Sequence, residues 1–198
     1  MNHALRCRCG TLRGHLERSA SATRAVCYCE DCQAYARFLG TPGVVDADGG
    51  TEVVASLPRH VRFTAGAGTL SCLSLSERGL LRWYASCCNT PIGNTPRNPK
   101  VPYAGLIHSC FEGGSAAIET TFGSRRIAVN TRSARNPVRS TPMATAARVV
   151  GLMAAALVDR LGGTYRENPF FAADTGAPIR SVRVLSSAER ERAYRRDG

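Results

Sequence analysis

Seven of the nine cysteines in this chain fall into three short clusters with the spacing of metal ligands. The clusters are Cys7 with Cys9, then Cys27 with Cys29 and Cys32, and finally Cys87 with Cys88. Zinc prefers about four soft, deprotonated ligands in a tetrahedron, and a C-x-C or C-x-x-C turn brings two thiolates to one ion at little entropic cost. The clusters therefore predict that the chain binds zinc, as one ion or two.

The middle cluster is the sharpest of these signals. Its C-x-C-x-x-C pattern offers three thiolates within six residues, from Cys27 to Cys32. A C-x-x-C pair alone would also fit a redox disulfide, but the additional Cys27 completes a tripod. Three protein ligands leave the fourth position of a zinc ion open, which is the arrangement that a catalytic zinc needs.

Three motifs together carry a family resemblance. They are C-R-C-G at Cys7–Gly10, the C-x-C-x-x-C pattern, and R-W-Y-A-S-C-C-N-T-P at Arg82–Pro91. Over about residues 3–130 the chain resembles the glutathione-dependent formaldehyde-activating enzyme family, also called the CENP-V/GFA domain. The resemblance implies folded β-sheets of the methionine sulfoxide reductase B type. It also implies a carbon–sulfur lyase that condenses formaldehyde with glutathione, so the expected partners are a small thiol such as glutathione and an aldehyde.

The same resemblance implies two zinc sites with different roles. Cys7 and Cys9 would join a later cysteine pair in a structural site, while the tripod of Cys27, Cys29 and Cys32 would be the catalytic site. The third motif departs from the family pattern, because Ala85 stands where a ligand is expected.

Cys88 matches the second cysteine of that motif, and Cys87 is the nearby thiol that could replace the missing one. In an extended strand the two side chains would face opposite ways, so both can bind one ion only if the chain turns there. His108 or Cys110 could instead supply the fourth ligand, or Cys87 could close the second site.

Addition of a thiol to an aldehyde also needs a proton carrier. Glu30 and Asp31 lie inside the tripod loop and could serve, although acidic residues at such a position more often cap the following helix. Arginines such as Arg37 could hold substrate carboxylates, but no particular arginine stands out.

The pattern along the chain predicts a mainly β, α+β fold with a C-terminal helical extension. We expect a zinc-binding β domain over residues 1–136 and the extension over residues 137–198. A short helix should follow Cys29, a long one should cover residues 144–161, and a capping box at Ser186 and Glu189 should open a last one over residues 188–196. Phe170 and Phe171 should pack back onto the body. The predicted strands are Val53–Ser56, Val61–Thr64, Thr69–Leu75, Leu80–Ser86, Val101–His108, Ala117–Phe122 and Ile127–Asn130.

Composition and charge narrow the range of partners and cellular locations that we expect for the protein. The 26 basic and 15 acidic side chains give a net charge of +11, nearly all from arginine. The alternative function is therefore a zinc-stabilised, non-catalytic module that binds nucleic acid or a protein partner, although no dense basic run favours nucleic acid. The apolar run Val149–Val158 is shorter than the roughly 20 residues that span a bilayer, so we expect no membrane partner. The N-terminus has no pattern of a secretory signal, which predicts a cytoplasmic protein with reduced thiols. The sequence leaves the oligomeric state open.

Overall fold

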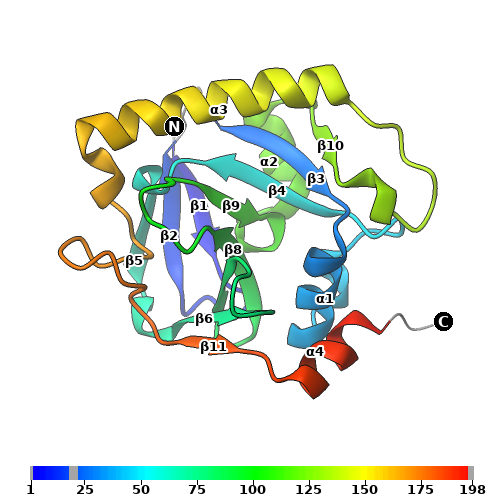
Figure 1. Ribbon diagram of the computed structural model, residues 1–198, viewed down its shortest axis with the longest axis horizontal. Helices are drawn as coiled ribbons and strands as arrows, with labels where there is room; N and C mark the ends of the chain where they lie inside the picture. The colour runs from blue at the N-terminus through cyan, green and yellow to red at the C-terminus, as the bar shows by residue number, and fades with distance from the viewer. Residues whose placement is uncertain (1, 18–21, 196–198) are drawn as a thin grey trace.

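The computed structural model describes residues 2–17 and 22–195 of the chain. These residues form eleven strands and four α-helices (Figure 1). The strands are β1 (Asn2–Arg6), β2 (Arg13–Glu17), β3 (Thr23–Cys27), β4 (Thr51–Ser56), β5 (Val61–Ala65), β6 (Leu70–Ser74), β7 (Leu81–Ala85), β8 (Thr90–Thr95), β9 (Ala104–Ile107), β10 (Ile127–Val129) and β11 (Val182–Val184). The helices are α1 (Glu30–Leu39), α2 (Gly114–Phe122), α3 (Pro142–Gly162) and α4 (Ser187–Tyr194).

The strands form two sheets. An eight-stranded sheet has the order β10-β3-β4-β9-β8-β7-β6-β11, and a three-stranded sheet has the order β1-β2-β5. The pairs at the two ends of the larger sheet, β10 with β3 and β11 with β6, are parallel, and its other pairs are antiparallel. The predicted mainly β, α+β class with a C-terminal helical extension is confirmed.

One core cluster lies between the sheets and is built around Trp83 of β7, which is fully buried, and a second packs helix α1 against the larger sheet. The ring centroids of Phe170 and Phe171 lie 5.1 and 6.3 Å from that of Trp83, so the prediction that these two residues pack back onto the body is confirmed. Through this contact and strand β11, the C-terminal segment joins the core and the main sheet. The predicted division after residue 136 stays a prediction.

Most predicted strands are present within a few residues of their expected bounds, but Ala117–Phe122 was wrong. This segment belongs to helix α2, whose N-cap Gly113 and first residue Gly114 both have positive φ. Its one fully buried side chain is Ile118, so the segment has neither the alternation of a strand nor a full apolar stripe. Strands β1, β2, β3, β8 and β11 were not predicted.

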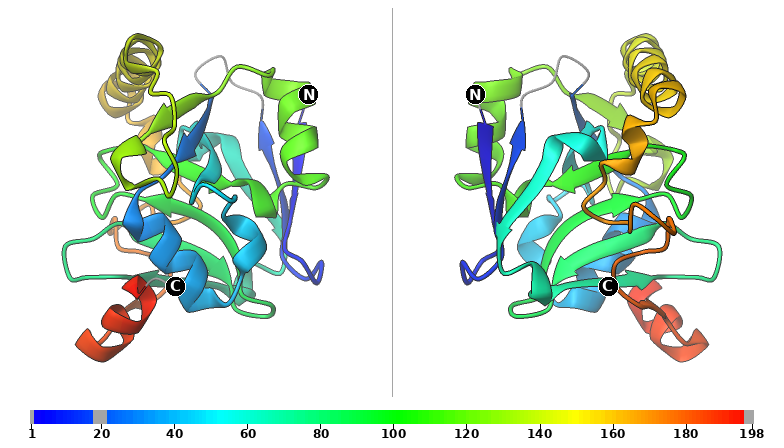
Figure 2. Two further views of the ribbon diagram at one scale, coloured as in Figure 1. Left: turned by 90° about the vertical axis from the view of Figure 1, so that its right-hand side faces the viewer. Right: turned by 90° about the vertical axis from the view of Figure 1, so that its left-hand side faces the viewer.

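The long helix was correctly predicted, and it is α3, which lies along one side of the molecule outside the sheets (Figures 1 and 2). By length and composition alone α3 could cross a membrane, because its mean hydropathy over an 18-residue window is 1.3. The length of the ten-residue apolar run was therefore not sufficient to exclude a membrane-spanning helix. An ion pair holds the helix to the body, because Asp159, which is 2% exposed, lies 2.8 Å from Arg59.

The last helix, α4, packs beside α1 (Figure 1). The predicted capping box is present, since Ser186 accepts from the Glu189 amide and the Glu189 side chain accepts from the Ser186 amide. The helix ends at Tyr194, and the predicted end at residue 196 lies outside the described residues.

Candidate metal centres

The three cysteines of the predicted tripod converge where β3 passes into α1. Cys27 ends β3, Cys29 is the N-cap of α1, and Cys32 lies in the first turn of the helix. The Cys27 and Cys29 sulfurs are 3.3 Å apart, and all three sulfurs lie within 4.8 Å of one another. Because helix α1 begins directly after strand β3, the three thiols lie close together.

The start of α1 favours negative charge at these sulfurs. The Cys32 amide donates to the Cys29 sulfur at 3.4 Å, so a thiol rather than Glu30 or Asp31 caps the helix, contrary to the preferred sequence-based reading. A helix N-terminus carries a partial positive charge that stabilises a thiolate. Asn130 adds a further donor, because its side-chain amide lies 3.3 Å from the Cys27 sulfur.

A buried arginine stands against the tripod. Arg82 of β7 is 2% exposed, and its guanidinium lies 3.9 Å from the Cys32 sulfur and 3.3 Å from the Asp31 carboxylate. Asp31 also accepts from the Tyr194 hydroxyl at 2.5 Å, so both of its oxygens are engaged. Asp31 therefore positions Arg82 and is not a free proton carrier.

Electrostatics within the tripod concentrate negative charge on one sulfur. Hydrogen bonding with Cys29 and then Cys32 lowers the pKa of Cys27 well below its ordinary value. Hydrogen bonding with Cys27 has the opposite effect on the other two thiols and raises the pKa of Cys29 to about 11. Without a bound cation the group holds one thiolate readily and resists the second, as expected for like charges in close contact.

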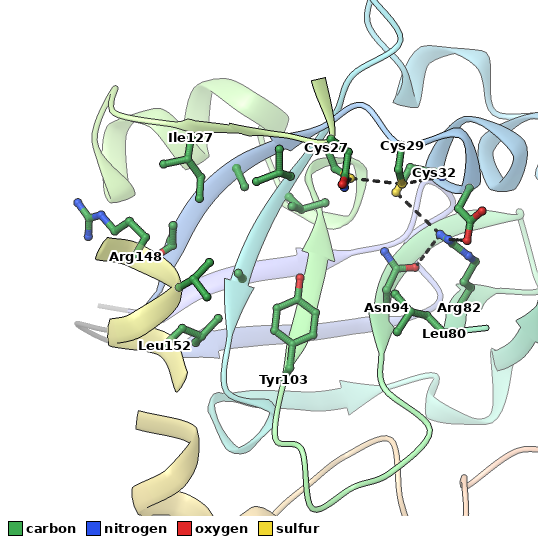
Figure 3. A pocket seen from close by; sticks show the side chains of 18 residues that line it. Cys27, Cys29, Cys32, Leu80, Arg82, Asn94, Tyr103, Ile127, Arg148 and Leu152 are labelled. Carbon is green, nitrogen blue, oxygen red and sulfur yellow. Dashed lines mark hydrogen bonds and ion pairs between the residues drawn. The ribbon is translucent and has the colours of Figure 1, made fainter. Parts of the chain in front are cut away.

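The tripod opens into a cavity of about 340 Å³ (Figure 3). Arg82, Asn94 and Tyr103 also line it, and α3 contributes Arg148 and Leu152. In Figure 3 the hydroxyl of Tyr103 points into the cavity toward the cysteine end. Within the described part of the chain no group forms a hydrogen bond with that hydroxyl. Burial raises the pKa of Tyr103, so the phenol keeps its proton at neutral pH.

The other two cysteine clusters meet on a different part of the surface. Cys7, Cys9, Cys87 and Cys88 form one group in which all four sulfurs lie within 4.8 Å of one another. The Cys87 sulfur is 3.7 Å from that of Cys7 and 3.3 Å from that of Cys9. The amide of Arg8 donates to the Thr90 hydroxyl at 2.9 Å, which ties the β1–β2 turn to the start of β8.

A turn explains how the adjacent residues Cys87 and Cys88 can lie in the same sulfur group. Residues 86–89 form a turn between β7 and β8, and Asn89 has a φ of 55°. This left-handed conformation is one that asparagine tolerates better than most residues, and it lets Cys87 and Cys88 approach the same point. Ala85, at the expected ligand position, is fully buried in the core. Cys87 therefore takes the place beside Cys7 and Cys9.

The alternative ligands lie elsewhere. His108 Nδ1 is 3.3 Å from the Glu52 carbonyl oxygen, and the fully buried Cys110 donates to the Ile92 carbonyl. Among the described residues neither belongs to a group that could hold a metal ion, and Cys87 does not join the tripod.

Both sulfur groups fit zinc by their donor chemistry and spacing. With Zn–S bonds of about 2.3 Å, sulfurs at the corners of a tetrahedron lie about 3.8 Å apart. Five of the sulfur–sulfur separations in the two groups are 3.3–3.8 Å, and all of them are within 4.8 Å. Four thiols complete a closed structural set, whereas three leave one position for another ligand.

Comparison with known families places the chain. A family described as a family of unknown function, DUF6151, matches residues 2–182. The chain belongs to this family. The matched residues contain every cysteine of both groups, whereas α4 lies beyond them. No curated protein and no solved structure matches the chain.

Sequence reasoning did not single out three residues of this DUF6151 chain that line the cavity beside the tripod. They are Arg82, Tyr103 and Asn130, which come from β7, the segment before β9 and the segment after β10. No local signal marked Arg82, because alternation along the strand predicts a half-buried strand with Arg82 on the face opposite Leu81 and Trp83, whereas Arg82 is 2% exposed. A buried charge in a strand needs a partner, and here the partners are Asp31 and Cys32.

Proposed function

We propose that this chain is a zinc enzyme that adds a small thiol to an aldehyde, or reverses that addition, at the tripod of Cys27, Cys29 and Cys32. The other group, formed by Cys7, Cys9, Cys87 and Cys88, holds a structural ion. The chain is then a carbon–sulfur lyase of the formaldehyde-activating type.

One observation carries the proposal: the three-thiol group faces a cavity of ligand size. A closed set of four ligands suits structure, and an open set of three beside a ligand-sized space suits chemistry. The motif resemblance to the glutathione-dependent formaldehyde-activating enzymes supports the same division of roles.

The reaction needs no oxidant or reductant. The substrate sulfur forms a bond to the carbonyl carbon, the carbonyl π bond breaks, and the thiol proton ends on the carbonyl oxygen. A zinc ion at the tripod would lower the pKa of a substrate thiol that coordinates it.

Residues around the tripod can interact with the charge on the zinc site and with the carbonyl oxygen of the aldehyde. Three thiolates around a divalent ion leave one net negative charge, and the buried guanidinium of Arg82, which Asp31 also contacts, lies beside Cys32 and attracts that charge. The Tyr103 hydroxyl points toward the cysteine end of the cavity as a hydrogen-bond donor, and we assign it to the carbonyl oxygen of the aldehyde. This gives Tyr103 the proton-handling role that the sequence offered to Glu30 and Asp31.

The test measures adduct formation between a thiol and formaldehyde by NMR exchange spectroscopy, with zinc-loaded protein. We expect the wild type to accelerate exchange and Cys27→Ser to abolish the acceleration. Cys72→Ala is the matched control, because Cys72 is buried in β6 outside both groups, and it should retain activity. Equal activity of Cys27→Ser and the wild type would refute the proposal.

A further inference from the structure

The cavity beside the tripod has aliphatic walls. On β3, Ala25 lies two residues before Cys27, so both point to the same face of the sheet. The neighbouring strands extend this face with small apolar side chains, namely Val53 and Ala55 of β4 and Ile127 and Val129 of β10. The sheet thus presents a continuous apolar floor that ends at the cysteines.

Helix α3 forms the opposite wall. It contributes Val149 and Leu152 to the cavity, one helical turn apart. The next residue, Val150, does not line the cavity and is 67% exposed. A ligand between sheet and helix therefore contacts hydrocarbon on both sides.

Polar groups gather at the ends of this space. Arg82, Asn94 and the Tyr103 hydroxyl stand at the cysteine end, and Arg148 stands at the opposite end (Figure 3). Along β3 the four residue steps from Cys27 back to Thr23 cover about 13 Å. A peptide thiol such as glutathione carries two carboxylates and an ammonium group, and the middle of the cavity offers no charged partner among its described lining residues.

We propose, resting on the function proposed above, that the substrate thiol is an apolar one, with an alkyl or aryl body held between α3 and the β10-β3-β4 face. Its sulfur lies at the tripod and its body replaces water along the aliphatic walls. Peptide thiols are the poorer ligands of this site.

Isothermal titration calorimetry of the zinc-loaded protein with ethanethiol, butanethiol and hexanethiol tests the proposal, with glutathione and the matching alcohols as comparisons. Transfer of each methylene from water into an apolar site contributes about 0.8 kcal/mol, which is about fourfold in affinity. We expect hexanethiol to bind about 10²-fold more tightly than ethanethiol, and more tightly than glutathione. Zinc content measured after each titration verifies that the thiols have not removed the metal.

Two neighbouring valines of α3 give a matched pair of variants. Val149→Asp places a carboxylate in the wall and should weaken hexanethiol binding about tenfold or more. Val150→Asp adds the same charge on the outer side of the same helix and should leave the affinity unchanged. Val149 is 48% and Val150 67% exposed, and neither belongs to the buried core, so neither variant disturbs it.

The outcomes separate the two proposals. Thiol affinity that does not depend on chain length, or glutathione binding as tightly as hexanethiol, would overturn this inference and leave the proposed function standing. Alcohols that bind as tightly as thiols, or no thiol binding at all, would overturn the proposed function and this inference with it. Length-dependent affinity that requires the thiol and is weakened by Val149→Asp alone would support both.

Discussion

Replacing one cysteine in each sulfur group should have very different effects on stability. Cys7 is 1% exposed and belongs to a group whose halves lie 80 residues apart, at Cys7 and Cys87. The unfolded chain cannot readily bring these halves together, so zinc bound there stabilises the folded state almost in full. Cys27 shares a six-residue segment with its partners, and an unfolded chain can also hold an ion with such a segment.

The expected magnitudes follow from this difference. Structural zinc contributes about 10–16 kcal/mol of binding free energy, so one of four thiolates accounts for about 3–4 kcal/mol. That is a large part of the roughly 5–15 kcal/mol that stabilises a typical domain. At about 2–4 °C per kcal/mol, Cys7→Ser should lower Tm by about 6–16 °C. Cys27→Ser should lower it by less than about 4 °C, because zinc held by both states stabilises neither.

Calorimetry and elemental analysis of the purified, reduced proteins test these values together. The wild type and Cys72→Ala should carry two zinc ions per chain, while Cys27→Ser should carry one and keep its circular dichroism spectrum. Equal losses of Tm in Cys7→Ser and Cys27→Ser would refute the division between a structural and an open site.

Three further predictions concern residues around the site. Tyr103→Phe should slow adduct formation about 10²-fold or more while thiol affinity stays the same, and unchanged rates in the exchange assay would remove Tyr103 from the mechanism. Burial would raise the pKa of Glu52, but hydrogen bonds from Ser115 and Arg24 outweigh it and place the pKa below its ordinary 4.5. The stabilisation from Glu52 is therefore complete above that pH and is lost as pH falls through the folded-state pKa. Glu52→Gln removes the nearest carboxylate from buried Arg24 and leaves Glu119 at 3.7 Å as its remaining acidic partner, so it should cost about 3 kcal/mol in urea unfolding at pH 7, and less at pH 4. Asp159→Ala removes the anchor of α3 and should speed hydrogen exchange in that helix about 5- to 150-fold, whereas unchanged protection would mean that other contacts hold α3 in place.

Local spacing predicted the three cysteine clusters, because cysteines a few residues apart must lie close in space, but only the family resemblance joined Cys7 and Cys9 to the third cluster. Spacing predicted the tripod of the second cluster by itself. It could not decide between Cys87 and the alternatives, since that depends on the left-handed turn at Asn89 and on Ala85 being used for the core. The long helix α3 was also predictable, because its apolar pattern and its terminal glycines are local features.

Sequence reasoning missed the features that depend on partners far away along the chain. Strand β3 was missed because Arg24 breaks its apolar pattern, and the compensating Glu52, 2.6 Å away, is 28 residues further along the chain. Arg82 and Tyr103 join the site only because the sheet brings β7 and the segment before β9 beside the end of β3. No spacing rule links residues so far apart.

The contact between Tyr194 and Asp31 has a consequence for divergence within the family. Tyr194 lies beyond the residues that DUF6151 matches, yet its hydroxyl reaches the carboxylate that holds Arg82 against Cys32. A substitution in the last helix can therefore alter the charge balance at the tripod without touching a single cysteine. Relatives that share every ligand can differ in reactivity through their tails alone.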